Sequence, residues 1–383
     1  MRKKIIALLV LLHLIVFISP AGLCFAYEPE TSCRSAALMD ARTGEILYEK
    51  NADEKLPIAS LTKIMTMLIA FEKLDGGAIS LNDNVTVSSK AASMGGSQLF
   101  LEEGEIRTVE ELLYGIAVES GNDAAVALAE YIGGSYDSFI SMMNDKADKL
   151  SLTNTHFSTP CGLIDENNYS TARDIALLSY ELLKHNIAYD YISTWNIELT
   201  IGKDNDIPRT LTNTNKLLST TDYVDGIKTG YTAAAGHCIS ATAEKNGLRL
   251  ISVVLNGTDS ISRFKDATSL LEFGFSNFSA KYIVKKGDCL TEINIENASE
   301  EKIPVIVQED LYLLCKLNEN KEVNCEIELQ NDLIAPIDHE TQVGKAVYTV
   351  GEEKFEIPLY PEKDIEKISF AEYLNKTKML FLP

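Results

Sequence analysis

The stretch PIASLTKIMTMLIAFEKL, residues 57–74, is the most informative part of this sequence. Its apolar residues lie on most sides of a helix, and Gly76 and Gly77 follow its end. A helix at a protein surface has one apolar face, whereas a helix that is apolar all round is packed in the interior. The stretch therefore predicts a buried helix that follows Pro57 and ends before Gly76.

Ser60 and Lys63 stand three residues apart in this stretch, so a helix places the hydroxyl and the amine on one face. A serine attacks a carbonyl when a base takes its proton, and a lysine is such a base only when it is neutral. Burial lowers the pKa of a lysine from its usual value of about 10.4. We therefore predict that Ser60 is a nucleophile and that Lys63 is its base and largely neutral. Two other Ser-x-x-Lys sequences, at 262–265 and 299–302, lie in polar segments.

Two further short motifs follow along the chain. Ser-Gly-Asn at 120–122 lies between two predicted helices, the first of which opens with a capping box at 108–111. Lys-Thr-Gly at 228–230 lies in a predicted strand. The Ser-x-Asn motif is weak alone, since 80–82 also fits it, whereas Lys-Thr-Gly occurs once. The combination of Ser-x-x-Lys, Ser-x-Asn and Lys-Thr-Gly occurs in penicillin-binding proteins and class A β-lactamases, and this order and setting make coincidence improbable.

Over about residues 30–275 the sequence resembles the serine D-Ala-D-Ala carboxypeptidases, the low-molecular-mass penicillin-binding proteins. The likeness extends beyond the three motifs to Leu-Met-Asp-Ala at 38–41, Ser-Thr-Ala-Arg-Asp at 170–174 and Arg-Leu-Ile at 249–251. It implies an α+β fold of the penicillin-binding-protein and β-lactamase type, with an antiparallel sheet flanked by helices, a helical subdomain and a small all-β C-terminal domain. It also implies removal of the terminal D-alanine from peptidoglycan pentapeptides, and covalent binding of penicillin to the active serine.

The resemblance implies a role for each site residue. Ser60 is acylated, Lys63 takes its proton, and Ser120 relays a proton to the leaving amine. Asn122 holds a substrate amide, and Lys228 is a second cation that helps to keep Lys63 neutral. The other expected substrate contacts are Thr229, Gly230, Tyr231 and Arg249.

Some of these assignments concern the terminal carboxylate of the substrate, and others concern its reacting carbonyl group. Thr229 is expected to hydrogen-bond the terminal carboxylate, and the backbone N–H groups of Ser60 and Tyr231 to form the oxyanion hole. Arg249 either supports carboxylate recognition or forms a surface salt bridge. No cofactor and no metal are expected, because the histidines have no metal-ligand spacing: His156, His185, His237 and His339.

The chain divides into four predicted segments: a signal peptide at 1–26, the catalytic domain at 27–278, a small β domain at 279–361 and a tail at 362–383. The catalytic domain contains a predicted hairpin at 36–48, antiparallel strands at 224–232, 238–244 and 248–255, and a helix at 262–273 that packs on the sheet. We interpret the β domain as a spacer that holds the catalytic domain away from the membrane. The tail either contacts a membrane surface as a helix, packs on the protein or frays.

The N-terminus predicts export. Three basic residues at 2–4 precede an apolar run at 5–18, which is shorter than the roughly 20 residues that span a bilayer, and cleavage after Ala26 is expected. A retained anchor and a lipoprotein acylated at Cys24 stay open as alternatives. The formal net charge of −21 makes nucleic acid an unsuitable partner, so the expected partners are peptidoglycan stem peptides and β-lactams, met outside the cytoplasm.

Three other functions compete with this interpretation. A class A β-lactamase needs a glutamate-activated water, and no Glu-x-x-Leu-Asn element is present. A DD-endopeptidase would use the same residues on cross-linked peptides, and a non-catalytic peptidoglycan-binding protein would keep only the fold. The chain departs from the family pattern at 159–163, where Thr-Pro-Cys-Gly-Leu replaces Asn-Pro-His-Gly-Leu; we predict that Cys161 is a buried structural thiol.

Overall fold

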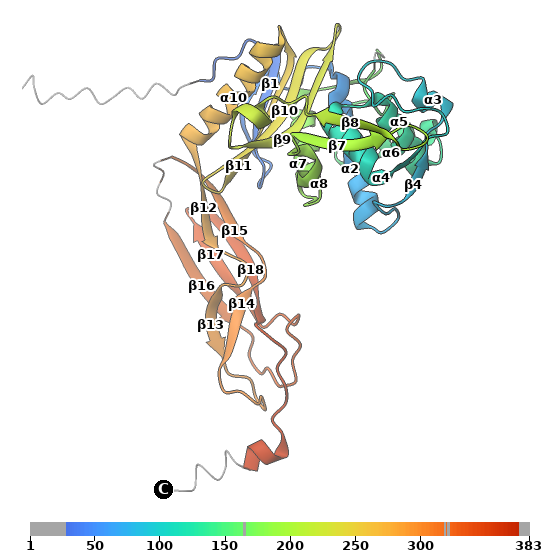
Figure 1. The fold of residues 1–383 in the computed structure, drawn as a ribbon. Helices are drawn as coiled ribbons and strands as arrows, with labels where there is room; N and C mark the ends of the chain where they lie inside the picture. The colour runs from blue at the N-terminus through green and yellow to red at the C-terminus, as the bar shows by residue number, and fades with distance from the viewer. Residues whose placement is uncertain (1–27, 164–165, 318, 320–321, 375–383) are drawn as a thin grey trace, which may run out of the picture.

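The computed structural model describes residues 28–374 apart from 164–165, 318 and 320–321. The predicted signal peptide, Cys24 and the last part of the tail lie outside these residues. Within them the chain forms an α+β body, from which an elongated arm of β-strands extends (Figure 1). The predicted fold class is confirmed.

One antiparallel sheet of five strands organises the α+β body. Its strands are β1 (Ser35–Asp40), β2 (Ile46–Lys50), β9 (Val224–Thr232), β10 (Gly236–Lys245) and β11 (Leu248–Gly257). Their order in the sheet is β2-β1-β11-β10-β9, so the predicted hairpin and the three predicted antiparallel strands are confirmed. β9 lies at one edge, and an edge strand offers unpaired backbone groups to an extended peptide.

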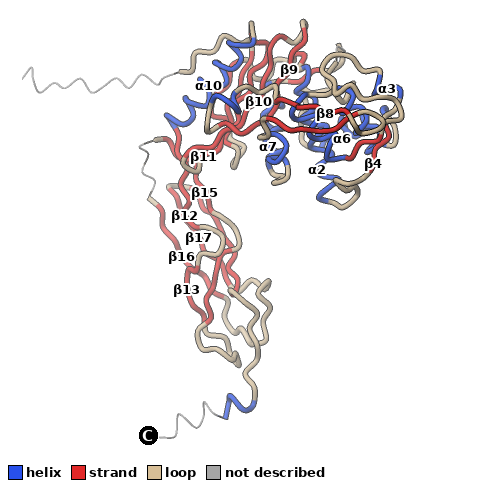
Figure 2. The backbone as a smooth tube through the Cα atoms, in the orientation of Figure 1, coloured by secondary structure: helices blue, strands red, loops and turns tan. Residues whose placement is uncertain are grey.

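Helices cover both faces of this sheet (Figure 2). On one face α10 (Ser260–Asn277) packs on β10 and β11, and the Asp259 carboxylate caps it by accepting hydrogen bonds from two backbone N–H groups. On the other face α7 (Ala172–Leu183) contacts β1 and β11. The two faces have separate apolar cores, which is why the central strands are buried on both sides.

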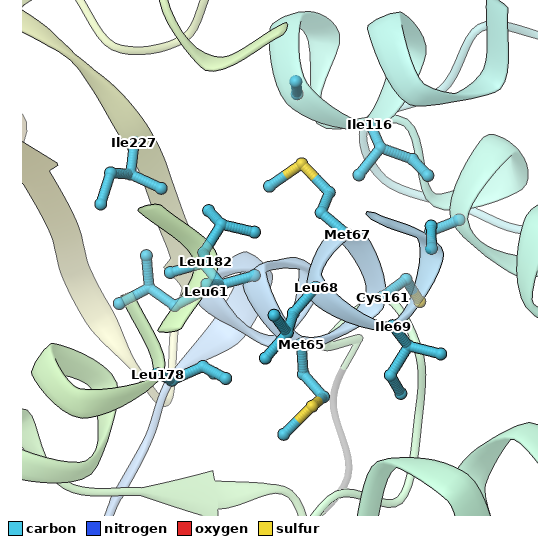
Figure 3. Close-up of a cluster of buried hydrophobic side chains, with 14 of the residues drawn as sticks. Leu61, Met65, Met67, Leu68, Ile69, Ile116, Cys161, Leu178, Leu182 and Ile227 are labelled. Atoms are coloured by element: carbon cyan, nitrogen blue, oxygen red, sulfur yellow. The ribbon is translucent and has the colours of Figure 1, made fainter. Parts of the chain in front are cut away.

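The predicted buried helix is α2 (Lys63–Asp75), and a 3₁₀ turn, η1 (Ala59–Thr62), precedes it. All nine residues from Lys63 to Phe71 are buried, which confirms that the helix is interior. Figure 3 shows Met65 and Met67 pointing to opposite sides of this helix into surrounding apolar side chains. Regular α-helix begins at Lys63, several residues after Pro57, because the chain first forms the tighter turn that carries Ser60.

A helical subdomain lies beside the sheet. The capping box at Thr108 and Glu111 opens α4 (Val109–Tyr114) as predicted. The sequence did not predict the hairpin of β7 (Asn196–Ile201) and β8 (Ile207–Thr212), which follows α8 (Ala188–Ile192). The remaining elements of this body are α3 (Ser89–Ala92), α4 (Val109–Tyr114), η2 (Gly115–Glu119), α5 (Asn122–Gly133), α6 (Tyr136–Lys149), α8 (Ala188–Ile192), α9 (Leu217–Thr220), β3 (Leu56–Pro57), β4 (Asn84–Thr86), β5 (Ile106–Thr108), β6 (Tyr169–Ser170), β7 (Asn196–Ile201) and β8 (Ile207–Thr212).

The β arm has an apolar core of its own. A two-stranded ribbon of β12 (Phe278–Val284) and β15 (Leu311–Lys316) joins it to the body. Its main sheet has the order β13-β14-β18-β17-β16 and comprises β13 (Cys289–Ile293), β14 (Ile303–Val307), β16 (Val323–Leu329), β17 (Gly344–Val350) and β18 (Glu353–Pro361). β17 and β18 form an antiparallel hairpin on either side of Gly351. The domain boundary at 278 stays a prediction, although α10 ends and β12 begins at this point.

Polar and aromatic groups join the arm to the body. The Tyr312 hydroxyl donates a 2.8 Å hydrogen bond to the Asp40 carboxylate at the end of β1. The Arg42 guanidinium lies 5.2 and 5.6 Å from the ring centres of Tyr282 and Tyr312, and 3.6 Å from the Asp310 carboxylate. These contacts hold the arm in one direction relative to the sheet.

The end of the described chain is a helical turn at 370–374 that exposes Phe370, Tyr373 and Leu374. Among the described residues no helix has the length and apolar character needed to cross a membrane. Contact of the tail with a membrane surface stays a prediction.

Candidate active site

Ser60 is half-buried and lies in the 3₁₀ turn at the start of α2, and this turn contacts β9 and β10 of the sheet. The preceding residue, Ala59, has a φ of 47°, a left-handed conformation that costs a non-glycine residue free energy. Tight packing holds it there, since a Cβ on Gly162 would lie 1.9 Å from the Ala59 carbonyl oxygen. Gly162 has a φ of 77°, so this position requires glycine both for conformation and for space.

Lys63 is fully buried, and three oxygen atoms surround its Nζ. These are Ser60 Oγ at 2.9 Å, Asn122 Oδ1 at 2.6 Å and the Cys161 carbonyl oxygen at 2.8 Å. Burial lowers the pKa of Lys63 from 10.5 to about 8, against a smaller opposing effect of Cys161 and Asp123. At pH 7 about one tenth of such a lysine is neutral. The predicted direction of the pKa shift is therefore confirmed, whereas the prediction that Lys63 is largely neutral is wrong at this pH.

Ser120 and Asn122 lie where the chain leaves η2 and enters α5. η2 is a π turn, and Ser120 after it has a φ of 63°, so the chain reverses sharply and both residues are buried. The Asn122 amide is fixed at both ends, because its Nδ2 donates a 2.6 Å hydrogen bond to the Gly95 carbonyl while its Oδ1 accepts from Lys63. The structure thus brings Asn122 to the serine–lysine pair across 59 residues of sequence.

Lys228 on β9 is also almost fully buried, with its Nζ 3.1 Å from the Thr229 carbonyl. Burial lowers the pKa of Lys228 well below its usual value, and the positive charges of Lys63 and Arg263 lower it further. The positive charge of Lys63 thus acts on Lys228. The reverse effect, by which Lys228 would keep Lys63 neutral, stays a prediction, because Lys228 is not among the groups that shift the pKa of Lys63. The Thr229 hydroxyl lies 2.7 Å from the Thr214 hydroxyl on the loop before β9.

β9 runs directly against the turn that carries Ser60. A Cβ on Gly230 would lie 2.9 Å from the Ile58 carbonyl oxygen and 3.0 Å from the Ser60 nitrogen, so only glycine allows this approach. Tyr231, the next residue, is 60% exposed and its ring stacks at 4.4 Å on His237 of β10. This approach brings the β9 backbone beside the Ser60 N–H, where the predicted oxyanion hole needs its two donors.

Arg249 is not brought to this cluster. It pairs with Glu244 in the register of β10 and β11, whereas Lys228 lies opposite Ser240. Four residues of strand separate the two positions, about 13 Å. The Arg249 guanidinium forms ion pairs with Asp225 at 2.9 Å and Glu244 at 2.6 Å.

Sequence motifs missed several groups that build the site. Thr214 belongs to no motif, and the Gly95 carbonyl is a backbone group whose identity carries no signal. Cys161 was predicted only as a buried thiol, and it is buried with a free thiol, but its carbonyl oxygen also accepts a hydrogen bond from Lys63. The six described cysteines are free thiols: Cys33, Cys161, Cys238, Cys289, Cys315 and Cys325.

Among the described residues, one group of side chains has the mutual distances of a metal site: Asp338, His339 and Asp364. It is exposed and lies in the β arm, and sequence spacing did not reveal it because Asp364 is 25 residues from His339. None of these three residues is among the hydrogen-bond partners of Lys63 in the serine–lysine cluster.

A serine with a lysine partner, buried beside an edge strand that carries Lys-Thr-Gly, defines an active-serine acyl-transfer enzyme of the penicillin-binding fold. Residues 24–259 match the family profile of the S11 peptidases, described as D-alanyl-D-alanine carboxypeptidase. Residues 278–367 match the C-terminal domain of penicillin-binding protein 5. The chain therefore belongs to the S11 family of serine-type D-Ala-D-Ala carboxypeptidases.

Individual relatives agree with this assignment. The D-alanyl-D-alanine carboxypeptidase DacF of Bacillus subtilis is 38% identical over 98% of this chain and 98% of its own length. The structure is similar to that of penicillin-binding protein 5 from Haemophilus influenzae, with a TM-score of 0.68 and 32% identity over 89% of this chain and 99% of that one. Penicillin-binding protein D2 from Listeria monocytogenes, solved in an ampicillin-bound form, is 33% identical over 65% of this chain and 100% of its own, with a TM-score of 0.58.

Proposed function

We propose that this carboxypeptidase is exported and removes the terminal D-alanine from peptidoglycan pentapeptides through an acyl-enzyme on Ser60. The observation that carries the proposal is the 2.9 Å contact between Lys63 Nζ and Ser60 Oγ inside a site that lowers the pKa of the lysine. A base within hydrogen-bond distance of the nucleophile is the geometric requirement for general-base activation.

In the first half of the reaction the Ser60 hydroxyl gives its proton to Lys63, and its Oγ bonds to the carbonyl carbon of the penultimate D-alanine. The backbone N–H groups of Ser60 and Tyr231 stabilise the oxyanion. The C–N bond to the terminal D-alanine then breaks, and its amine takes a proton relayed through Ser120. Lys228 and Thr229 hold the terminal carboxylate during these steps.

In the second half water attacks the Ser60 ester, the peptide leaves with its new carboxylate, and Ser60 regains its proton. Asn122 donates its remaining amide N–H to a substrate carbonyl. Arg249, which is paired with two carboxylates, has no part in this scheme. No cofactor and no metal take part in any step.

The proposed place of action is outside the cytoplasm, on the cell-wall side of the membrane. The signal peptide proposed at 1–26, with cleavage after Ala26, supports it, as does the cell-wall activity of the family. We assign the catalytic domain to 27–278, the β spacer to 279–361 and the tail to 362–383. The expected ligands are peptidoglycan stem peptides and β-lactams, since a relative was solved with ampicillin bound.

A fluorescent penicillin tests the nucleophile. The wild-type protein should carry one covalent label, and Ser60→Ala should carry none while it keeps the wild-type melting temperature. A matched control, Ser262→Ala, changes the serine of another Ser-x-x-Lys sequence and should keep the label. Labelling that survives Ser60→Ala would exclude this serine as the nucleophile.

Mass spectrometry of a pentapeptide after incubation tests the reaction. The expected change is the loss of one alanine residue, with the tetrapeptide as the other product. A DD-endopeptidase would instead convert cross-linked dimers into monomers and leave the pentapeptide intact. A binding protein would change neither substrate, and a β-lactamase would release penicillin quickly and leave both peptides unchanged.

A further inference from the structure

A small pocket lies beside the nucleophile turn, outside the cluster of site residues described above. Its volume is about 80 Å³, and its lining comes from the segment before Ser60, the loop after Cys161 and the end of β9: Pro57, Ala59, Gly162, Leu163, Glu166, Asn168, Thr232 and Ala234. The lining includes Ala59, the immediate neighbour of Ser60. A substrate held at the serine therefore has part of its chain next to this pocket.

The direction of β9 indicates which part of the substrate lies next to this pocket. In the proposed function the terminal carboxylate lies at Lys228 and Thr229, and the reacting carbonyl at Tyr231. A strand advances about 3.3 Å per residue, so Thr232 lies about 10 Å from Thr229, near the residue that precedes D-Ala-D-Ala in a peptide aligned with this edge. Thr232 lines the pocket, so the pocket is in reach of the side chain of the residue that precedes D-Ala-D-Ala.

The chemistry of the lining selects the kind of side chain. Pro57, Ala59, Leu163 and Ala234 make most of the wall apolar. Asn168 is already engaged, because its Nδ2 donates to Thr62 Oγ1 at 2.8 Å and its Oδ1 accepts from the Ser158 N–H.

Glu166 supplies the charge of this pocket. This residue is exposed and lines the pocket, and within the described part of the chain no hydrogen bond or ion pair engages its carboxylate. A mostly apolar pocket whose lining includes one carboxylate without a partner matches an aliphatic chain that ends in an ammonium group.

We propose that this pocket binds the cationic aliphatic side chain of the residue immediately before D-Ala-D-Ala, with Glu166 as its counter-ion. The proposal rests on the proposed function, and it assigns a specificity-determining residue to the acyl-donor side of the site. Glu166 touches the substrate side chain and takes no part in proton transfer at Ser60.

Two tripeptides that differ only in charge test the proposal. Nα-acetyl-Lys-D-Ala-D-Ala carries the free ammonium group, and Nα,Nε-diacetyl-Lys-D-Ala-D-Ala replaces it with a neutral amide. We expect kcat/KM for D-alanine release to be about fivefold higher for the charged peptide, the size expected for an ion pair at a partly exposed rim. In Glu166→Gln the ratio of the two kcat/KM values should fall to about one. The value for the charged peptide should fall, whereas the value for the neutral peptide should stay unchanged.

A charge reversal and a control complete the design. In Glu166→Lys, kcat/KM should be lower for the charged lysine peptide than for its Nε-acetylated form. This variant should also favour a peptide with glutamate in place of lysine. Glu353→Gln removes an exposed carboxylate of the β arm and should keep the wild-type ratio.

Each failure has its own signature. If neither tripeptide loses D-alanine, the proposed function fails. If both are hydrolysed equally by the wild type, only the pocket assignment fails. If Glu166→Gln slows both peptides equally and lengthens the lifetime of the penicillin acyl-enzyme, Glu166 acts on the attacking water, and the proposal is overturned.

Discussion

The pH dependence of Ser60 acylation is the most direct consequence of the buried lysine. With a pKa of about 8, Lys63 is neutral in about 1% of molecules at pH 6, about 10% at pH 7 and about 90% at pH 9. If only the neutral amine accepts the Ser60 proton, the second-order rate of penicillin acylation should rise about 90-fold from pH 6 to pH 9 and level off above the pKa.

The assay measures the appearance of penicillin-labelled protein with time at a fixed ionic strength, on wild type and on two lysine variants. Lys63→Met keeps the aliphatic chain but removes the base, so acylation should fall by about 10²- to 10⁴-fold at pH 8. Lys73→Met removes a lysine from the same helix at a position distant from Ser60, and it should keep the wild-type rate and profile. A rate that is constant from pH 6 to pH 9, or normal labelling of Lys63→Met, would refute the role of Lys63 as base.

The same pKa shift affects stability. The pKa of Lys63 is lower in the folded chain than in the unfolded chain, so the unfolded chain binds more protons between about pH 8 and pH 10.5. The free energy of unfolding therefore contains a contribution from Lys63 that rises with pH across this window. Because the pKa of Lys63 falls from 10.5 to about 8, the charged lysine costs the folded protein about 3 kcal/mol at pH 7. Burial of the base is thus obtained at the expense of stability.

Three further variants test packing, the isolated arginine and the arm joint. Gly162→Ala should lower the melting temperature and slow acylation at least tenfold, because its Cβ would overlap the Ala59 carbonyl; wild-type values would show that the turn adapts. Arg249→Ala should lower stability, because it removes two ion pairs, yet it should leave kcat/KM for a pentapeptide within about twofold of the wild-type value. A large increase in KM would instead show that this residue contacts the substrate. Tyr312→Phe removes the hydrogen bond to Asp40 and should destabilise the protein by about 1 kcal/mol in urea unfolding, with no change in the acylation rate.

Local patterns in the sequence predicted the parts of the site that depend on one helix or one strand. Ser60 and Lys63 are adjacent on a single helical turn, and the apolar residues around them were sufficient to predict burial and a lowered pKa. The meeting of Lys63 with Asn122, 59 residues away, followed from family likeness and from no local pattern. Thr214 could not be predicted, because its contact with Thr229 depends on the path of a loop without regular structure.

Arg249 shows why strand identity is insufficient for placing a residue. The sequence correctly put it on a strand of the same sheet as Lys228, but the distance between the two depends on the register and on the position along the strand. The register places Arg249 beside Glu244, near the turn between β10 and β11, whereas Lys228 faces Ser240. The short turn between β10 and β11 fixes the pairing of Arg249 with Glu244, but apolar alternation alone does not fix the register between β9 and β10, so the separation of Arg249 from Lys228 was not predicted.

In the proposed mechanism, the atoms around Lys63 Nζ direct the proton of Ser60 to this lysine. Asn122 Oδ1 and the Cys161 carbonyl oxygen can only accept hydrogen bonds, and the orientation of the Asn122 amide is fixed because its Nδ2 donates to the Gly95 carbonyl. A neutral amine has two N–H groups and one lone pair. The two acceptors engage both N–H groups, so the lone pair is left for the third neighbour, the Ser60 hydroxyl. The neutral lysine is therefore held as an acceptor toward Ser60, and the protonated lysine, with three N–H groups, donates to all three oxygens. When Lys63 takes the proton of Ser60, its charge changes but its Nζ atom stays in the same place between the same three oxygen atoms. An efficient base requires this kind of preorganisation.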